Sequence, residues 1–129
     1  MKESILIDTD IIIDLLRGYE PSKLFFNEIM QNNFDAYISV VSIMELNSGT
    51  STKSTEEQVR IQKIVDLFKT ITINPQIAQL AGFIVRDYAF AFPDALIASS
   101  FLNSKLNCLV TRNIKHFEKI KNIKIKKPY

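Results

Sequence analysis

The chain has 129 residues, of which 47% are hydrophobic and 23% are charged, and a formal net charge of +2. This composition excludes a disordered chain, and the length predicts a single domain, residues 1–129, with a core of its own. The single cysteine excludes an internal disulfide and a cysteine-cluster metal site. No apolar run approaches the roughly 18–20 residues of a membrane span. We see no secretory signal, so we expect a cytoplasmic protein with no membrane partner.

The charge is unevenly distributed along the chain. Residues 1–111 hold 9 Lys/Arg and 13 Asp/Glu, a net of −4, whereas residues 112–129 hold 7 Lys/Arg and one acid, a net of +6. An acidic body with a basic tail is typical of a protein that binds cations in one place and phosphates nearby. The tail sequence KIKNIKIKK is equally typical of a solvated edge strand, because lysines keep such edges from pairing. Both interpretations stay open.

Apolar periodicity predicts alternating strands and helices from the start of the chain. A strand over residues 3–7 runs into Asp8, and a helix follows over residues 11–18, ending at a glycine. A second helix is predicted over residues 23–33. Its apolar stripe is expected to consist of Leu24, Phe25, Ile29 and Met30.

The alternation continues to the end of the chain. A strand over residues 36–40 precedes a helix over residues 41–49, and a polar loop over residues 50–55 leads to a capping box that opens the next helix. The remaining elements are a helix, a brief strand, two helices, a strand, a helical turn and a last strand, at residues 56–69, 70–73, 74–88, 95–105, 107–111, 113–119 and 122–126. This order indicates an α/β sandwich around a mainly parallel sheet, in which a site lies beyond the carboxyl ends of the strands.

Three acidic residues lie where such a site is expected. Asp8 directly follows the first strand, and Asp94 lies at the N-terminus of a helix; capping a helix would explain either carboxylate equally well. Glu45 interrupts an otherwise apolar segment, so it is either an exposed helix position or a paired or metal-bound carboxylate, because burying it alone is costly. If the three carboxylates converge, they form an oxygen-only site suited to Mg²⁺ or Mn²⁺. Their spacing alone does not establish convergence.

Four sequence blocks carry a resemblance to a known family. They are LIDTDIIIDLL, ISVVSIMEL, PDALIASSFL and LVTRNIKHF, in this order within residues 4–117. Together they resemble the PIN domain, and most closely the single-domain toxin ribonucleases of the VapC type. The resemblance implies a three-layer αβα sandwich with a short parallel sheet, and an endoribonuclease that depends on Mg²⁺ or Mn²⁺. It also implies an RNA substrate, a homodimer, and a cognate antitoxin in a groove between the helices around residues 24–30 and 59–68, unless these helices pack shut.

The resemblance also assigns roles to single residues. By position, Asp8, Glu45 and Asp94 match the family's acidic residues, which would bind the cation and carry out a hydrolysis that leaves 5′-phosphate and 3′-hydroxyl ends. The family often has a fourth acid where this chain has Asn113, whose amide oxygen can hold a metal-bound water, so we expect one well-held cation. Supporting roles are expected for four further residues: Thr9 and Thr111 in orienting the ligands, and Arg112 and Lys115 in holding RNA phosphates.

Other interpretations of these residues stay open. Thr9 and Thr111 also fit turns at strand ends, and Arg112 and Lys115 also fit surface salt bridges. The same fold suits a non-catalytic RNA- or protein-binding PIN module. The sequence DTD after the first strand resembles the aspartyl nucleophile motif of haloacid-dehalogenase-type phosphatases, but the PDALIASS block has no explanation there.

The remaining expectations concern packing. Asp10 and Asp14 are expected to face solvent or to cap the first helix. His116, the only histidine, is able to touch phosphate but is expected to be neither ligand nor base, and Cys108 is expected to lie in the core. Most phenylalanines fall at helical spacing and are also expected in the core: Phe25, Phe26, Phe68, Phe83, Phe90, Phe92, Phe101 and Phe117.

Overall fold

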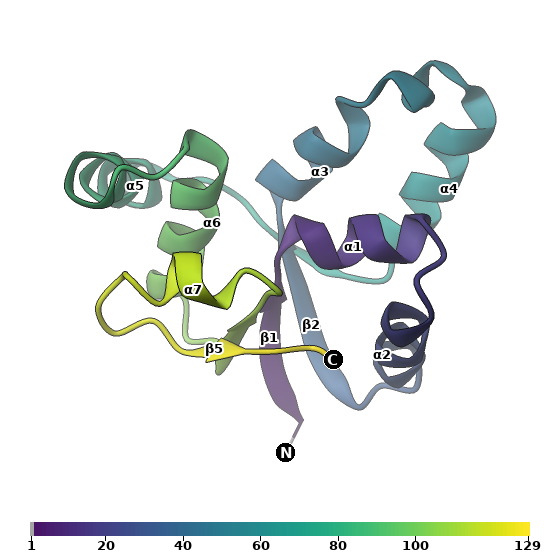
Figure 1. The fold of residues 1–129 in the computed structure, drawn as a ribbon, viewed down its shortest axis with the longest axis horizontal. Coiled ribbons are helices and arrows are strands. Elements are labelled where there is room, and N and C mark those ends of the chain that lie inside the picture. The colour runs from purple at the N-terminus through teal and green to yellow at the C-terminus, as the bar shows by residue number, and fades with distance from the viewer. Residues whose placement is uncertain (1) are drawn as a thin grey trace.

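The computed structural model describes residues 2–129, which form a five-stranded sheet with helices on both faces (Figure 1). The strands are β1 (Glu3–Ile7), β2 (Phe34–Ser39), β3 (Lys69–Ile71), β4 (Cys108–Val110) and β5 (Ile125–Lys126). Their order across the sheet is β3-β2-β1-β4-β5, and every neighbouring pair is parallel. The predicted α/β class with a mainly parallel sheet is confirmed.

The helices divide between the two faces of the sheet (Figure 1). On one face lie α1 (Thr9–Leu16), α2 (Glu20–Met30), α3 (Val40–Asn47) and α4 (Thr55–Val65), with a short 3-10 helix, η1 (Thr50–Lys53), in the segment predicted to be a loop. On the other face lie α5 (Pro75–Tyr88), α6 (Phe92–Leu102) and α7 (Ile114–Phe117). The three-layer arrangement is therefore confirmed. Within residues 2–129, no helix combines the length and the apolar character that crossing a membrane requires.

Alternate residues of the central strands supply two separate cores. Ile5 and Ile7 of β1 pack with residues of α1, α2 and α4, whereas Leu6 between them packs with residues of α5 and α6. In β4, Leu109 joins the core of Leu6, and Val110 joins the opposite core. Successive side chains of a strand point to opposite faces, so a central strand with helices on both sides is apolar at every position. This explains why Ile5–Ile7 of β1 and Cys108–Val110 of β4 are short, continuous apolar runs.

The face of α2 that packs against the sheet differs from the predicted one. Leu24 and Met30 are 67% and 57% exposed, whereas Phe25, Phe26 and Ile29 are buried. The buried residues are three and four positions apart, whereas Leu24 is five positions from Ile29, so helical spacing favours the buried face over the predicted one. The face that contains Phe26 is the buried one, and its ring packs edge-on against Phe25.

Two of the predicted core phenylalanines are also exposed. Phe83 of α5 and Phe92 at the start of α6 are 44% and 72% exposed, because no further layer covers the outer side of these helices. Phe92 borders a pocket of about 360 Å³ between α5 and α6. The other predicted core aromatic residues and Cys108 are buried, and burial raises the pKa of the Cys108 thiol to about 11.

The basic tail forms one edge of the sheet. Strand β5 pairs with β4 only over Ile125–Lys126, so it is shorter than the predicted strand over residues 122–126. Lys126 is ion-paired with Glu3 of β1, with 2.8 Å between Nζ and Oε1. The edge-strand interpretation of the tail is therefore correct, and it leaves the other lysines of the tail available for anions.

Replacing a fully buried leucine and an exposed leucine by alanine tests the packing of the core. Leu109→Ala, at a fully buried position, is expected to lower the free energy of unfolding by about 2–5 kcal/mol, because it removes apolar contacts and leaves a cavity. Leu24→Ala is the matched control and is expected to change it by less than about 0.5 kcal/mol. Urea denaturation followed by circular dichroism measures both. Equal losses for the two variants would contradict the described core.

Candidate active site

Asp8 lies where the order of the sheet reverses. The two neighbours of β1, which are β2 and β4, lead to opposite edges of the sheet, and parallel α/β sheets bind ligands at the carboxyl ends of such strands. Asp8 caps α1, because its Oδ1 accepts a hydrogen bond of 2.8 Å from the backbone N–H of Thr9. Its Oδ2 accepts a bond of 2.7 Å from the hydroxyl of Thr111, at the end of β4. Capping therefore uses only one of the two carboxylate oxygens.

The surroundings of Asp8 oppose its negative charge. Asp8 is 6% exposed, and its pKa is raised from 3.8 to about 7, first by burial and then by the negative charge of Asp10. Asp94 raises this pKa further, while the hydrogen bonds from Thr111 and Thr9 lower it. Two of the predicted site acids, Asp8 and Asp94, therefore act on one another. A cation beside them would favour the charged form of Asp8.

Glu45 is connected to Asp8 through Thr9. The hydroxyl of Thr9 donates a hydrogen bond of 2.8 Å to Oε1 of Glu45 and lies 2.7 Å from the hydroxyl of Ser42. A hydroxyl has one proton to donate, so Ser42 donates to Thr9, and Thr9 donates to Glu45. Ser42 is fully buried on α3, one helical turn before Glu45. Sequence reasoning missed Ser42, although a serine three residues before Glu45 in an apolar segment was a usable signal.

Asp94 enters the site from the opposite face of the sheet. It is the third residue of α6, whose N-cap is Ala91, so it does not cap the helix. Its Oδ2 lies 3.1 Å from Nε2 of His116 on α7. Sequence reasoning gave His116 no role near the acids, because nothing in the local pattern places α7 beside α6. The structure brings the two side chains together.

Asn113, Arg112 and Lys115 are exposed where the chain leaves β4. The backbone N–H of Asn113 donates to the Thr111 hydroxyl at 3.0 Å, so Thr111 accepts this bond while it donates to Asp8. The side chains of Asn113, Arg112 and Lys115 border a surface hollow of about 500 Å³. Asn113 thus lies two residues along the chain from Thr111, whose hydroxyl holds Asp8.

Arg112 forms ion pairs, as one of its two interpretations held. Its Nε lies 2.8 Å from Oδ2 of Asp14 and 3.9 Å from Oδ2 of Asp10. The hydroxyl of Tyr129 donates to the same oxygen of Asp14, and burial together with this bond raises the pKa of Tyr129. The prediction that Asp14 faces solvent or caps the helix is wrong, because Asp14 is 7% exposed and held by these two partners. The charge of a buried aspartate is here matched by an arginine from a distant segment.

The oxygen donors at this site fit a hard divalent cation. Among residues 2–129, no three His, Cys, Asp or Glu side chains already stand close enough together to hold a metal ion. The available donors are nevertheless carboxylate oxygens, which Mg²⁺ and Mn²⁺ prefer. Asp8 is buried beside two further negative charges, and Oδ1 of Asp10 is buried without a hydrogen-bond partner in the described part of the chain. Asp94 and Glu45 are only partly buried, so their side chains have room to adjust to an ion.

The comparison with family models decides the family. The model of the PIN domain matches residues 5–123 of this chain. The chain belongs to the PIN domain family. The resemblance carried by the four sequence blocks is therefore confirmed, and the phosphatase interpretation of the DTD sequence is left without support.

This PIN domain is similar to several solved structures. A toxin–antitoxin complex from Klebsiella pneumoniae matches with 28% identity and a TM-score of 0.76, over 97% of this chain and 98% of that one. VapBC2 from Rickettsia felis, bound to a DNA fragment from its promoter, matches with 23% identity and a TM-score of 0.80, over 96% and 98%. DNA-bound VapBC from Salmonella typhimurium matches with 20% identity and a TM-score of 0.76, over the whole of both chains. No curated protein matches the chain.

The hydrogen bond between Thr111 and Asp8 is expected to stabilise this PIN domain. Thr111→Val keeps the shape of the side chain but removes the donor to Asp8 and the acceptor for the Asn113 N–H. We expect a loss of about 1–3 kcal/mol in the free energy of unfolding, because buried polar groups are left unpaired. Urea denaturation at pH 8 in EDTA measures this loss. The control is Thr70→Val, at an exposed position of β3, and an equal effect of the two variants would contradict the role of Thr111.

Proposed function

We propose that this chain is an endoribonuclease that depends on Mg²⁺ or Mn²⁺ and acts as the toxin of a toxin–antitoxin pair. One observation carries the proposal: Asp8, at the carboxyl end of β1, is linked through Thr9 to Glu45, and the charge of Asp94 raises the pKa of Asp8. Each of these acids, from three distant segments, accepts a hydrogen bond. Thr111 holds Asp8, Thr9 holds Glu45, and the imidazole of His116 on α7 holds Asp94. Membership in the PIN domain family and likeness to toxin–antitoxin complexes support the proposal.

The proposed mechanism uses this chain's carboxylates in distinct roles. A bound Mg²⁺ or Mn²⁺ would polarise the scissile phosphate and activate water for in-line attack. Asp8 and Asp94 would hold the cation, because their negative charges already act on one another. Glu45, linked to Asp8 only through Thr9, is suited to complete the shell or to accept the proton of the attacking water. Asn113 would hold a water with its amide oxygen. Hydrolysis in this way leaves a 5′-phosphate and a 3′-hydroxyl.

The hollow beside Asn113 is the proposed place for the RNA backbone. Lys115 and Lys127 border it and carry positive charge next to the site. Arg112 also borders it, with 47% of its side chain exposed, and its five N–H groups allow it to keep Asp14 and still donate to a phosphate. Such contacts fix the position of the RNA and carry no sequence information. The sequence preference therefore has to come from other parts of the surface.

Cleavage of total cellular RNA by the purified protein in Mn²⁺ tests the nuclease. We expect discrete fragments with 5′-phosphates, abolished by EDTA and slowed at least about 100-fold by Asp94→Asn, because this substitution removes a ligand charge. The matched control is Asp87→Asn, an exposed aspartate of α5, which is expected to cleave like the wild type.

The competing proposal is a non-catalytic PIN module that binds RNA or protein. It would follow from a folded, antitoxin-free protein that cleaves no RNA at any metal concentration. In that case the presence of Asn113, where the family often has a fourth acid, would be the first explanation to test for the lack of cleavage. A binding module would also keep its effect on cells when Asp94 is replaced by Asn, whereas a nuclease would lose it.

An antitoxin partner is proposed from the solved structures that this chain resembles, which are described as toxin–antitoxin complexes. The chain has exposed apolar side chains on both α2 and α4. Leu24, Met30 and Val59 are all close to half exposed or more. We propose that the antitoxin covers exposed apolar side chains of α2 and α4, because these are the helices between which the sequence resemblance implies the antitoxin groove.

A homodimer is proposed through α5 and α6. Phe83 of α5 and Phe92 of α6 are exposed, and Phe92 borders the pocket of about 360 Å³. Figure 1 places these helices far from α2. We expect Phe92→Lys to convert a dimer into a monomer, because it places a charge in the centre of an apolar contact. Leu24→Lys, at a similarly exposed apolar residue on the other side, is expected to remain a dimer. Size-exclusion chromatography with light scattering measures both, and a monomeric wild type would contradict the proposal.

A further inference from the structure

Two of the three acids are held by threonine hydroxyls, and the third is held by an imidazole. Asp8 and Glu45 accept hydrogen bonds from the hydroxyls of Thr111 and Thr9, both of which are buried. Asp94 is the exception. Its side-chain partner is the imidazole of His116, the single histidine of the chain.

The ring of His116 is fixed by aromatic neighbours. It stacks on the ring of Phe90, with 4.0 Å between the ring centroids and 16° between the planes. It also packs edge-on against Phe117, at 5.3 Å and 66°. Phe90 and Phe117 are both buried, so the surfaces that hold the imidazole belong to the core. A ring held in this way has little freedom to rotate, and Nε2 is left facing Asp94.

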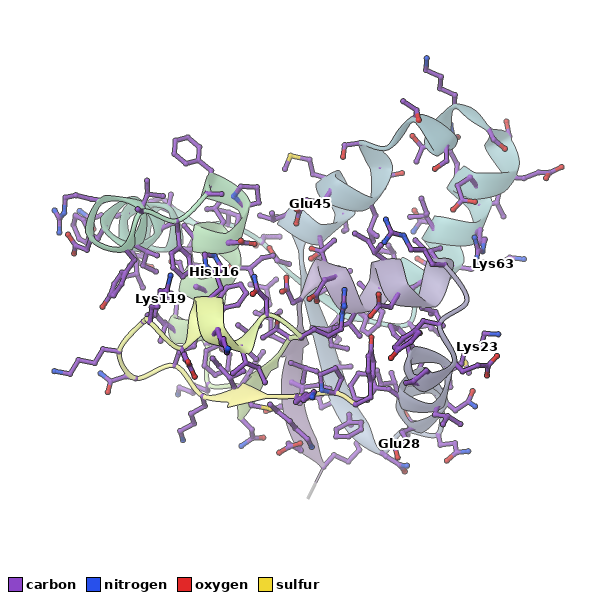
Figure 2. All side chains as sticks on the ribbon, in the orientation of Figure 1. Lys23, Glu28, Glu45, Lys63, His116 and Lys119 are labelled. Carbon is purple, nitrogen blue, oxygen red and sulfur yellow. The ribbon has the colours of Figure 1, made fainter. Side chains whose placement is uncertain are left out.

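The direction of the hydrogen bond follows from the acceptor. A carboxylate only accepts, so the bond of 3.1 Å requires that Nε2 of His116 donates to Oδ2 of Asp94. Figure 2 shows His116 in the space between the ribbons of α7 and α6, with Glu45 on α3 across from it. The bond uses one carboxylate oxygen and leaves Oδ1 for another partner. Asp94 is thereby set in one orientation although a third of its side chain is exposed.

We propose that His116 is the positioning residue of Asp94: its imidazole, clamped by Phe90 and Phe117, orients this carboxylate toward the cation. The inference rests on the proposed function, because it assigns a role within the same site. The hydrogen-bonded partners of metal ligands fix ligand orientation, and their loss typically lowers metal affinity by 10–100-fold. His116 does not itself contact cation or RNA in this role.

Two substitutions separate the hydrogen bond from the packing. His116→Phe keeps an aromatic ring between Phe90 and Phe117 but removes the donor. His116→Gln loses the ring but keeps an amide N–H that can reach Asp94. The matched control is Lys119→Gln, an exposed residue of the same segment that points away from the site in Figure 2.

The affinity for Mn²⁺, measured by calorimetric titration of the metal-free proteins, is the decisive measurement. We expect His116→Phe to bind Mn²⁺ about 10-fold or more weakly while its melting temperature stays close to that of the wild type. We expect His116→Gln to bind within about threefold of the wild type, and Lys119→Gln to be unchanged. RNA cleavage by the same variants is expected to follow the order of the Mn²⁺ affinities.

The outcomes distinguish this inference from the proposed function. If the wild type binds Mn²⁺ and cleaves RNA but His116→Phe binds equally well, His116 only fills space, and the inference is overturned while the nuclease stands. If His116→Gln binds Mn²⁺ much more weakly than the wild type while His116→Phe binds it normally, the aromatic ring and not the N–H donor matters. The inference is then again overturned. A wild type that binds no Mn²⁺ overturns the proposed function itself, and the positioning role with it.

Discussion

The buried carboxylate of Asp8 is the constraint around which the rest of the site is arranged. It lies at the end of the central strand, where burial and neighbouring acids raise its pKa to about 7. A carboxylate in that position needs donors, and the fold supplies them from both sides: the N-terminus of α1 through Thr9, and the end of β4 through Thr111. The same two threonines connect Asp8 to Glu45 and to the backbone of Asn113. One buried charge thus ties three segments of the chain together.

The structure treats its acids in two ways. Asp14 has a matching cation, Arg112, and a hydroxyl donor, Tyr129, so its charge is balanced within the protein. Asp8 and Asp94 are held by neutral hydroxyls and by an imidazole, and burial, followed by the charges of Asp10 and Asp94, raises the pKa of Asp8. A bound cation would favour the charged form of such a buried carboxylate, which is one physical reason that carboxylates with raised pKa values occur at functional sites.

Much of the candidate site could be predicted from the sequence, because several of its residues lie at the ends of predictable elements. Asp8 directly follows the apolar run of β1, and Thr111 directly follows that of β4, so the parallel arrangement alone brings them to one edge. The contacts of Asp94 and Asp14 did not follow. They depend on how α6 and α7, or the tail and α1, lie against one another, and no local pattern encodes the approach of residues 22 or 115 positions apart.

The sequence by itself determined the order of the elements, the parallel sheet and the family. Apolar periodicity and the order of the four motif blocks can be read along the chain without knowing how the helices pack. Only the tertiary structure decided that Leu24 and Met30 of α2 stay exposed, because apolar residues occur on several sides of this helix and packing against the sheet buries one of them. It likewise left Phe92 exposed, because burial depends on whether a further layer exists. The tertiary structure also gave Asp94 its partner: a histidine that the sequence left without a role became adjacent once α7 folded back across α6.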